Sequence, residues 1–151
     1  MGTTTRLVCR KMTIDDAEAV AALDLKSFGE IDSWSAEYFF YAAQNERAEF
    51  LIVEDNGKIV ACAGADIFTD AAEIVSFAVD PDRRNQGIGT KLLETLIETV
   101  KKRGASVLIL EVRPSNKVAI KLYEKFGFEI VDREENYYWD EDAWIMAKEI
   151  F

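Results

Sequence analysis

A strand, a glycine-containing loop, a helix and a second strand follow one another between residues 72 and 112, and this order constrains the fold more than any other feature. The predicted strand Ala72–Val79 ends at Asp80-Pro81, because proline cannot donate to a sheet ladder. Apolar residues then recur at helical spacing up to Gly104, a typical C-terminal cap. Val107–Val112 is a nearly continuous apolar run, which is typical of a strand buried on both faces. The pattern therefore predicts a βαβ unit.

Further strands and helices are expected around this unit. Strands are expected at Leu7–Arg10, Glu49–Glu54, Ile59–Phe68, Glu129–Arg133 and Ala143–Ala147, with Asn56-Gly57 supplying the positive φ angles of a tight hairpin. Helices are expected from the capping-box-like Thr13-Ile14-Asp15-Asp16, after Ser35, and after Ser115 or Asn116, with a loop from Phe28 to Trp34. The early strands read as an antiparallel meander, so the fold class is mixed α/β (α+β).

Length and charge limit the classes of function. A chain of 151 residues fits one domain, residues 1–151, and no apolar run approaches the roughly 18 residues of a transmembrane helix. The net charge of -10 argues against a protein that binds the nucleic-acid backbone, and no membrane association is expected. Residues 83–103 nevertheless carry 6 basic and 2 acidic side chains. This basic island is either a solvated helix face or the site of one anionic ligand.

Histidine is absent from the chain. Ser-His-Asp sites, Cys-His sites and His-ligated metal sites are therefore excluded, no metal is expected, and proton transfer must use a carboxylate, Tyr, Cys, Lys or water. Cys9 and Cys62 lie among apolar neighbours and form no CxxC motif, which indicates two buried thiols in a reducing compartment. Residues 1–6 contain no apolar signal core, so a cytoplasmic location is expected.

The pattern Arg84-x-x-Gly87-x-Gly89 follows the predicted strand and opens the predicted helix inside the basic island. Glycines let the backbone pass close to a ligand, and a helix N-terminus directs free N–H groups and positive dipole toward an anion, which suits a pyrophosphate. An ordinary turn could also contain these residues. The spacing fits neither the nucleoside-triphosphate P-loop nor the Rossmann dinucleotide fingerprint.

Three segments carry a resemblance to a known family. They are Val79 to Thr90, Leu110 to Phe128, and Asn136-Tyr137-Tyr138 followed by Glu141-Asp142-Ala143 and Met146. The first resembles the acetyl-coenzyme A motif of the GCN5-related N-acetyltransferase (GNAT) superfamily, and the second resembles the superfamily's later strand and helix. The third is more selective, and together the three segments are similar to the bacterial members that acetylate the N-terminal alanine of a small-subunit ribosomal protein. The match runs from about residue 72 to the end, while the first half matches mainly in its order of elements.

The resemblance implies a GNAT fold and acetyl-coenzyme A as cosubstrate. The fold would be a mostly antiparallel mixed sheet of six to seven strands with a splayed central edge, flanked by about four helices. Phe77 and Val79 would offer backbone groups to the pantetheine arm, and Asn116 would contact the cofactor near its thiol. The pyrophosphate would be wrapped by Arg84, Asn85, Gln86, Gly87, Ile88, Gly89 and Thr90.

The resemblance also assigns Glu111 as general base and Tyr123 as general acid for the departing thiolate. From the residues alone, Glu111 interrupts an apolar strand and lies either at its exposed end or in a functional position. Tyr123 lies on the apolar stripe of its helix, where tyrosine is more often a core residue. The reaction would be direct attack of a neutral amine on the thioester, and an α-amine, with a pKa near 8, needs only modest help from a base.

Phe28, Trp34, Tyr137 and Tyr138 are the candidates for the acceptor groove, although they could equally roof the core. The chain departs from the family by having Ser33 before the tryptophan and Glu134-Glu135 before Asn-Tyr-Tyr. These departures concern the acceptor rather than the fold. The acceptor expected is the N-terminus of a ribosomal protein, with the enzyme a monomer or weak dimer. The alternatives are a small amine such as a polyamine, or a non-catalytic acyl-coenzyme A sensor.

Overall fold

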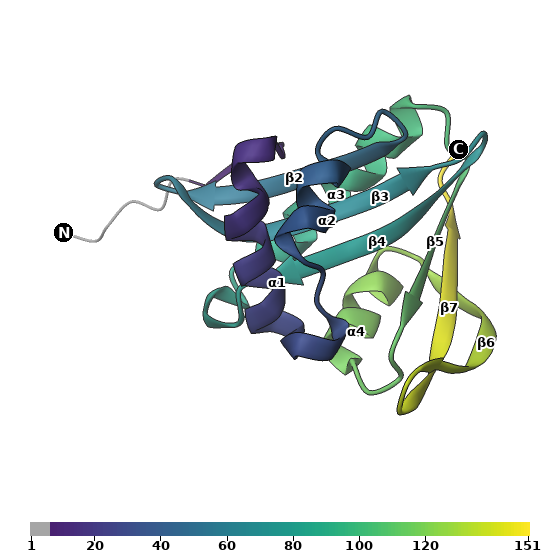
Figure 1. The fold of residues 1–151 in the computed structure, drawn as a ribbon. Coiled ribbons are helices and arrows are strands. Elements are labelled where there is room, and N and C mark those ends of the chain that lie inside the picture. The colour runs from purple at the N-terminus through teal and green to yellow at the C-terminus, as the bar shows by residue number, and fades with distance from the viewer. Residues whose placement is uncertain (1–6) are drawn as a thin grey trace.

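The computed structural model describes residues 7–151, so the prediction that residues 1–6 carry no apolar signal core concerns a segment outside the described residues. Seven strands form one mixed sheet in the order β1-β2-β3-β4-β5-β7-β6 (Figure 1). Their bounds are β1 Leu7–Lys11, β2 Ala48–Asp55, β3 Lys58–Ile67, β4 Ala71–Val79, β5 Val107–Val112, β6 Glu129–Tyr138 and β7 Glu141–Glu149. All neighbouring strands are antiparallel except β4 and β5, which are joined through a helix as the predicted βαβ unit.

Helices cover both faces of the sheet (Figure 1). On one face lie α1 (Ala17–Asp32) and α2 (Ala36–Ala42), which pack on a buried cluster containing Val20, Leu23, Phe39, Phe50 and Ile52. On the other face lie α3 (Ile88–Lys102) and α4 (Lys117–Lys125), whose apolar stripes join a cluster containing Leu92, Leu93, Leu96, Leu108, Leu110 and Met146. Short 3-10 turns precede α1 at Ile14–Asp16 and α3 at Pro81–Arg83. The predicted mixed fold with four helices is therefore confirmed.

The local turn and cap signals have the predicted geometry. Asn56 and Gly57 have φ angles of 52° and 87° in the β2–β3 hairpin, and Gly104 has a φ of 97° after α3. Asn116, rather than Ser115, caps α4, because its side-chain oxygen accepts a hydrogen bond from the backbone N–H of Ala119. These features depend only on neighbouring residues, which is why the sequence reveals them.

Two predictions about element boundaries are wrong. Helix α1 does not end before Phe28 but continues to Asp32 across a kink at Gly29, so the connection to α2 is shorter than the predicted loop. Gly29 has a φ of 80°, which a glycine adopts without a Cβ clash, and the chain therefore turns and resumes helical structure at once. Strands β6 and β7 extend beyond the predicted bounds to meet in a tight hairpin, and β6 carries polar, exposed residues that give no apolar alternation to detect.

Strands β4 and β5 separate along their length, as the resemblance implies. They pair from Ala71–Ile74 against Val107–Leu110. At Val75 a bulge shifts the register between β3 and β4, since Gly64 faces Ser76 while Ala65 faces Ile74. A bulge bends and twists its strand, so the remainder of β4 pairs with β3 while it diverges from β5.

Candidate active site

A cavity of about 230 Å³ lies where β4 and β5 separate. The structure brings eight of the predicted site residues together in its lining: Phe28, Trp34, Phe77, Glu111, Asn116, Tyr123, Tyr137 and Tyr138. They come from α1 and its end, from β4 and β5, from the start and body of α4, and from the end of β6. Residues more than 100 positions apart in the sequence thus meet at one opening in the sheet.

Glu111 is half-buried on β5, next to Glu73 of the diverging strand β4. Burial, followed by the hydrogen bond and negative charge of Glu73 and the charge of Glu134, raises the pKa of Glu111 from its ordinary value of 4.5 to about 7. A carboxyl with a pKa near 7 can accept a proton at neutral pH and still have enough basicity to assist an amine. The position of Glu111 therefore suits a general base better than an exposed strand end.

Tyr123 is 5% exposed and reaches the cavity from α4. Its ring packs edge-on against Phe77, with centroids 5.9 Å apart, and against Phe128 at 5.6 Å. Burial raises the pKa of its phenol well above the usual value, so the hydroxyl is protonated at neutral pH. Tyr123 can therefore be both a core residue and a proton donor, because its ring packs in the core while its side chain also lines the cavity.

Trp34 is held at the cavity by two hydrogen bonds. Its backbone N–H donates to the Asp24 carboxylate at 2.7 Å, and its indole N–H donates to the carbonyl oxygen of Val75 at 3.2 Å. Asp24 is itself buried, which raises its pKa to about 6. The ring stacks on Tyr38 with centroids 4.2 Å apart. The tryptophan thus ties the short connection after α1 to the bulge that opens the sheet.

The candidate acceptor aromatics remain partly open to solvent. Phe28 is 38% exposed, Trp34 45% and Tyr137 47%, whereas residues that simply roof a core would be covered. Tyr137 and Tyr138 lie edge to face with centroids 4.9 Å apart at the end of β6. These four side chains border the cavity on two sides, one formed by α1 and one by the β6–β7 hairpin.

Several cavity residues were missed by sequence reasoning. Asp24, Asp32 and Glu73 add three carboxylates to Glu111, and Arg113 is the one basic side chain in the lining among the described residues. Glu73 and Arg113 could have been noticed as charged residues in or directly after apolar strands. Asp24 and Asp32 belong to a helix with a mixed surface, where a carboxylate gives no distinguishing signal.

The Arg84–Thr90 segment lies outside this cavity lining, at the start of α3. Asn85 and Gly87 have φ angles of 62° and 76°, and the first N–H groups of a helix have no partner within it. Gly89 lies where α3 packs on β4 and α4, because a Cβ placed on it would be in van der Waals contact, at 3.4 Å, with the side chains of Val79 and Leu122.

Neighbouring charges hold the same segment in place. Arg83 forms an ion pair with Asp55, with an N–O distance of 2.8 Å, whereas Arg84 is exposed. Lys26 of α1 binds both Asp80 and Asp82 at 2.8 Å, an anchor that the sequence did not reveal. A loop of free N–H groups at a helix start, flanked by an exposed arginine, fits a pyrophosphate. The residues present therefore suit the phosphate groups of coenzyme A.

Within residues 7–151 no group of three or more Cys, Asp or Glu side chains is arranged to hold a metal ion. No described helix is both long and apolar enough to cross a membrane.

Comparison with known proteins agrees with this geometry. The sequence model of the "Acetyltransferase (GNAT) family" matches residues 17–128. The chain is 40% identical over 139 residues to the "[Ribosomal protein bS18]-alanine N-acetyltransferase" of Escherichia coli K12, covering 89% of this chain and 93% of that protein. The crystal structure of the Escherichia coli ribosomal-protein-S18-alanine N-acetyltransferase superposes with a TM-score of 0.87 at 38% identity, over 96% of this chain and 94% of that one. PaiA N-acetyltransferase from Thermoplasma acidophilum, solved in complex with coenzyme A, has the same fold, with a TM-score of 0.82 at 21% identity over 95% and 99% of the two chains.

Proposed function

This chain belongs to the GNAT family of acetyltransferases and is an acetyl-coenzyme A-dependent N-acetyltransferase, and we propose that its acceptor is the N-terminal α-amine of a protein, specifically the N-terminal alanine of a small-subunit ribosomal protein. The proposal treats residues 1–151 as one catalytic domain. It also implies action in the cytoplasm, where ribosomal proteins are made.

One observation carries the catalytic part of the proposal. Glu111 and Tyr123 line the same cavity at the divergence of β4 and β5, and their environments favour opposite roles. The pKa of Glu111 is raised to about 7, so it exchanges protons near neutrality, while the phenol of Tyr123 stays protonated. A pair of titratable groups poised in this way supports an assignment of base and acid.

Bound acetyl-coenzyme A supplies a thioester whose acyl carbon the acceptor amine attacks. Glu111 would accept a proton from that amine, directly or through a water molecule, so that nitrogen keeps a lone pair for bond formation. Tyr123 would hold its proton for the sulfur that leaves as the carbon–sulfur bond breaks. Neither Cys9 nor Cys62 is required, and burial raises the pKa of the Cys62 thiol far above neutrality.

The cofactor side of the site would use the main chain. Phe77 and Val79 lie on β4 beyond its last pairing with β5, so this edge could hydrogen-bond an extended pantetheine arm. The start of α3, with Arg84 beside it, would hold the pyrophosphate. Asn116 lines the cavity, but its side chain also caps α4, so its contribution near the thiol would come with a structural role.

The acidic lining suits a cationic acceptor. Asp24, Asp32, Glu73 and Glu111 place four carboxyl groups around the cavity, and Glu134, one of the departures from the family pattern, adds negative charge near Glu111. Such a surface would attract a protonated chain end, but it would attract a polyamine as well. A small-amine acceptor is therefore retained as the second candidate.

The deciding experiment compares acceptors. Wild-type protein is incubated with labelled acetyl-coenzyme A and, in parallel, an alanine-ended ribosomal peptide, the same peptide with its α-amine blocked, and spermidine. We expect acetylation of the free peptide alone. Acetylation of spermidine with none of the peptide would replace the acceptor, and tight coenzyme A binding with no acetylated amine would support a sensor instead.

A further inference from the structure

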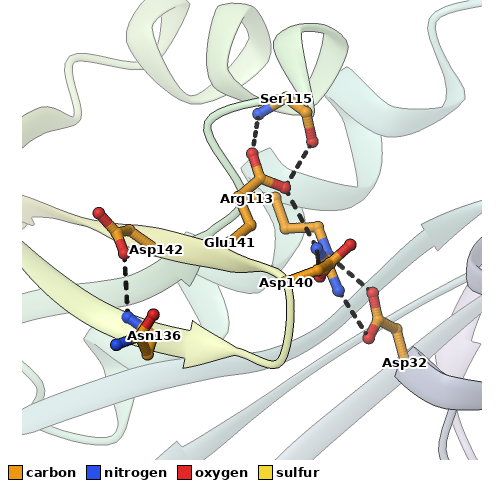
Figure 2. Close-up of polar contacts among 7 residues, drawn as sticks. All are labelled: Asp32, Arg113, Ser115, Asn136, Asp140, Glu141 and Asp142. Atoms are coloured by element: carbon orange, nitrogen blue, oxygen red, sulfur yellow. Dashed lines mark hydrogen bonds and ion pairs between the residues drawn. The ribbon is translucent and has the colours of Figure 1, made fainter.

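Arg113 forms the densest ionic network near the cavity (Figure 2). It lies directly after β5, with its side chain 20% exposed. Its guanidinium makes a two-pronged contact with Asp32, with N–O distances of 2.8 and 3.0 Å, and its Nη1 donates to Asp140 at 2.6 Å and Glu141 at 3.1 Å. The Tyr138 ring lies against the same guanidinium, 4.3 Å from ring centroid to carbon.

The partners of Arg113 belong to separate borders of the cavity. Asp32 is the last residue of α1, beyond the Gly29 kink, while Asp140 lies in the β6–β7 turn and Glu141 is the first residue of β7. Glu141 also accepts hydrogen bonds from the backbone N–H and hydroxyl of Ser115, just before α4, at 2.9 and 2.8 Å (Figure 2). One side chain therefore connects α1, the turn after the tyrosine pair and the start of α4.

A hydrogen bond within the β6–β7 hairpin stabilises the turn. Asn136, which has a φ of 54°, donates its backbone N–H to the Asp142 carboxylate at 2.9 Å (Figure 2). This contact closes the hairpin across the irregular register that precedes Tyr138. The hairpin is thus a formed unit, and Arg113 supplies an ionic link between it and α1, because the same guanidinium binds Asp32 and both Asp140 and Glu141.

The hydrogen bonding of Arg113 separates two possible roles. Four donations to three carboxylates use most of the five N–H groups of a guanidinium, so Arg113 is not arranged to bind an acidic acceptor. If the cation were removed, Asp32, Asp140 and Glu141 would be left close together as like charges. Their repulsion would push α1 and the β6–β7 turn apart.

We propose that Arg113 is a positioning residue for the acceptor. It sets the spacing between the α1 side, which carries Phe28 and Trp34, and the hairpin side, which carries Tyr137 and Tyr138. This inference rests on the proposed function, because it assumes that the acceptor chain lies between these aromatic side chains. Arg113 takes no part in proton transfer, and it contacts neither Glu111 nor Tyr123 among the interactions of the described residues.

The test compares Arg113→Ala and Arg113→Lys with Arg10→Ala. Arg10 is a matched control, because it makes the same two-pronged contact with one aspartate, Asp16, and a further contact with Glu54, but lies on β1 away from the cavity. Acceptor KM, acetyl-coenzyme A KM and kcat are measured with whichever amine the wild type acetylates. We expect Arg113→Ala to raise the acceptor KM about tenfold or more, with the acetyl-coenzyme A KM changed less than about twofold.

The conservative variant adds a second criterion. Lysine keeps the charge but cannot form the planar two-pronged contact, so Arg113→Lys should fall between wild type and Arg113→Ala. Arg10→Ala should lower the thermal midpoint without changing the acceptor KM. An unchanged acceptor KM in Arg113→Ala, an equal rise in both KM values, or an equal acceptor effect in Arg10→Ala would overturn the proposal.

Hydrogen exchange provides a readout that needs no acceptor. The amides of residues 136–142 should exchange faster in Arg113→Ala than in wild type or Arg10→Ala, and unchanged exchange would also refute the inference. If Arg113→Ala fails to fold, Asp140→Asn serves in its place, since it removes one exposed partner and should raise the acceptor KM about twofold to threefold. Wild type without turnover on any amine would contradict the proposed function, while the exchange comparison would still decide the role of Arg113.

Discussion

Replacing Glu73 by glutamine should make the enzyme relatively more active at acidic pH. Glu73 lines the same cavity as Glu111, from the last stretch of β4 that pairs with β5, and its hydrogen bond and charge are the largest contributions after burial to the raised pKa of Glu111. Glutamine has nearly the same shape and no charge. The variant therefore keeps the cavity while removing the carboxylate that opposes ionisation of the proposed base.

The size of the effect follows from the raised pKa. Glu111 titrates at about 7 instead of 4.5. Because burial is the largest cause and remains in the variant, Glu73→Gln should lower the pKa of Glu111 by about one pH unit, equivalent to roughly 1.4 kcal/mol. At pH 6 a group with a pKa of 7 is roughly one-tenth ionised, and a group with a pKa of 6 is half ionised. The ionised base should therefore be about fivefold more abundant in the variant at pH 6, and equally abundant at pH 9.

The assay is kcat/KM for the acceptor from pH 5.5 to 9 in wild type and Glu73→Gln. The ratio of the two enzymes is the informative quantity, because ionisation of the acceptor amine affects both equally. It should rise about fivefold between pH 9 and pH 6. Carbon-13 NMR of the glutamate carboxyls gives the pKa of Glu111 without turnover, and Glu94→Gln on the exposed surface of α3 should leave both measurements unchanged.

A ratio that does not vary with pH, together with an unchanged NMR titration of Glu111, would refute the coupling between the two carboxyls. A shifted titration with a constant ratio would refute the assignment of Glu111 as the base. The experiment therefore tests the electrostatic argument and the mechanistic argument separately.

Three further predictions test the site. Tyr123→Phe should lower kcat about 10- to 100-fold while leaving coenzyme A affinity within about twofold, because the ring packing is kept and the proton donor is lost; steady-state kinetics and calorimetry measure both. Gly87→Glu should weaken coenzyme A binding by at least about tenfold, because it places a carboxylate and a Cβ at a φ of 76° in the loop proposed to bind the pyrophosphate. Calorimetric binding that equals wild type would contradict this. Glu111→Gln should raise the thermal midpoint relative to wild type by about 2–4 °C at pH 8 and by little at pH 4.5. A carboxyl with a raised folded pKa favours the folded state below its unfolded pKa, and it loses that contribution as the pH rises through about 7. Scanning calorimetry at both pH values measures the difference.

Much of the framework could be predicted because it depends on short-range chemistry. Alternation, helical spacing and the caps at Gly104 and Asn116 identify the βαβ unit and α4 from adjacent residues. The backbone conformation of the Arg84-x-x-Gly87-x-Gly89 loop likewise follows from its own residue types. The resemblance to the GNAT superfamily then identified Glu111 and Tyr123, whose roles remain predictions, and the structure places both at one cavity.

The two element boundaries that were predicted wrongly share a physical cause. Phe28 was expected in a loop because the sequence does not show that Gly29 turns the chain inside a continuing helix. The end of β6 was missed because hydrogen bonds to β7 stabilise it, while its exposed side chains follow no apolar period. In both places the conformation is decided by a partner segment rather than by the local residues.

Residue types and near-neighbour spacing were enough to predict the class of fold and a glycine-containing loop suited to an anion, and the missing histidine alone excluded histidine chemistry. The surroundings of the proposed base and of the proposed acceptor groove, in contrast, depend on how distant segments pack. Glu73 lies near Glu111 because β4 and β5 pair in parallel up to Ile74 and Leu110, just before the strands separate, and Asp32 reaches Arg113 because α1 runs across the sheet (Figure 1). Charges interact through space, with a strength that depends on distance and burial, and neither quantity is a property of the sequence order.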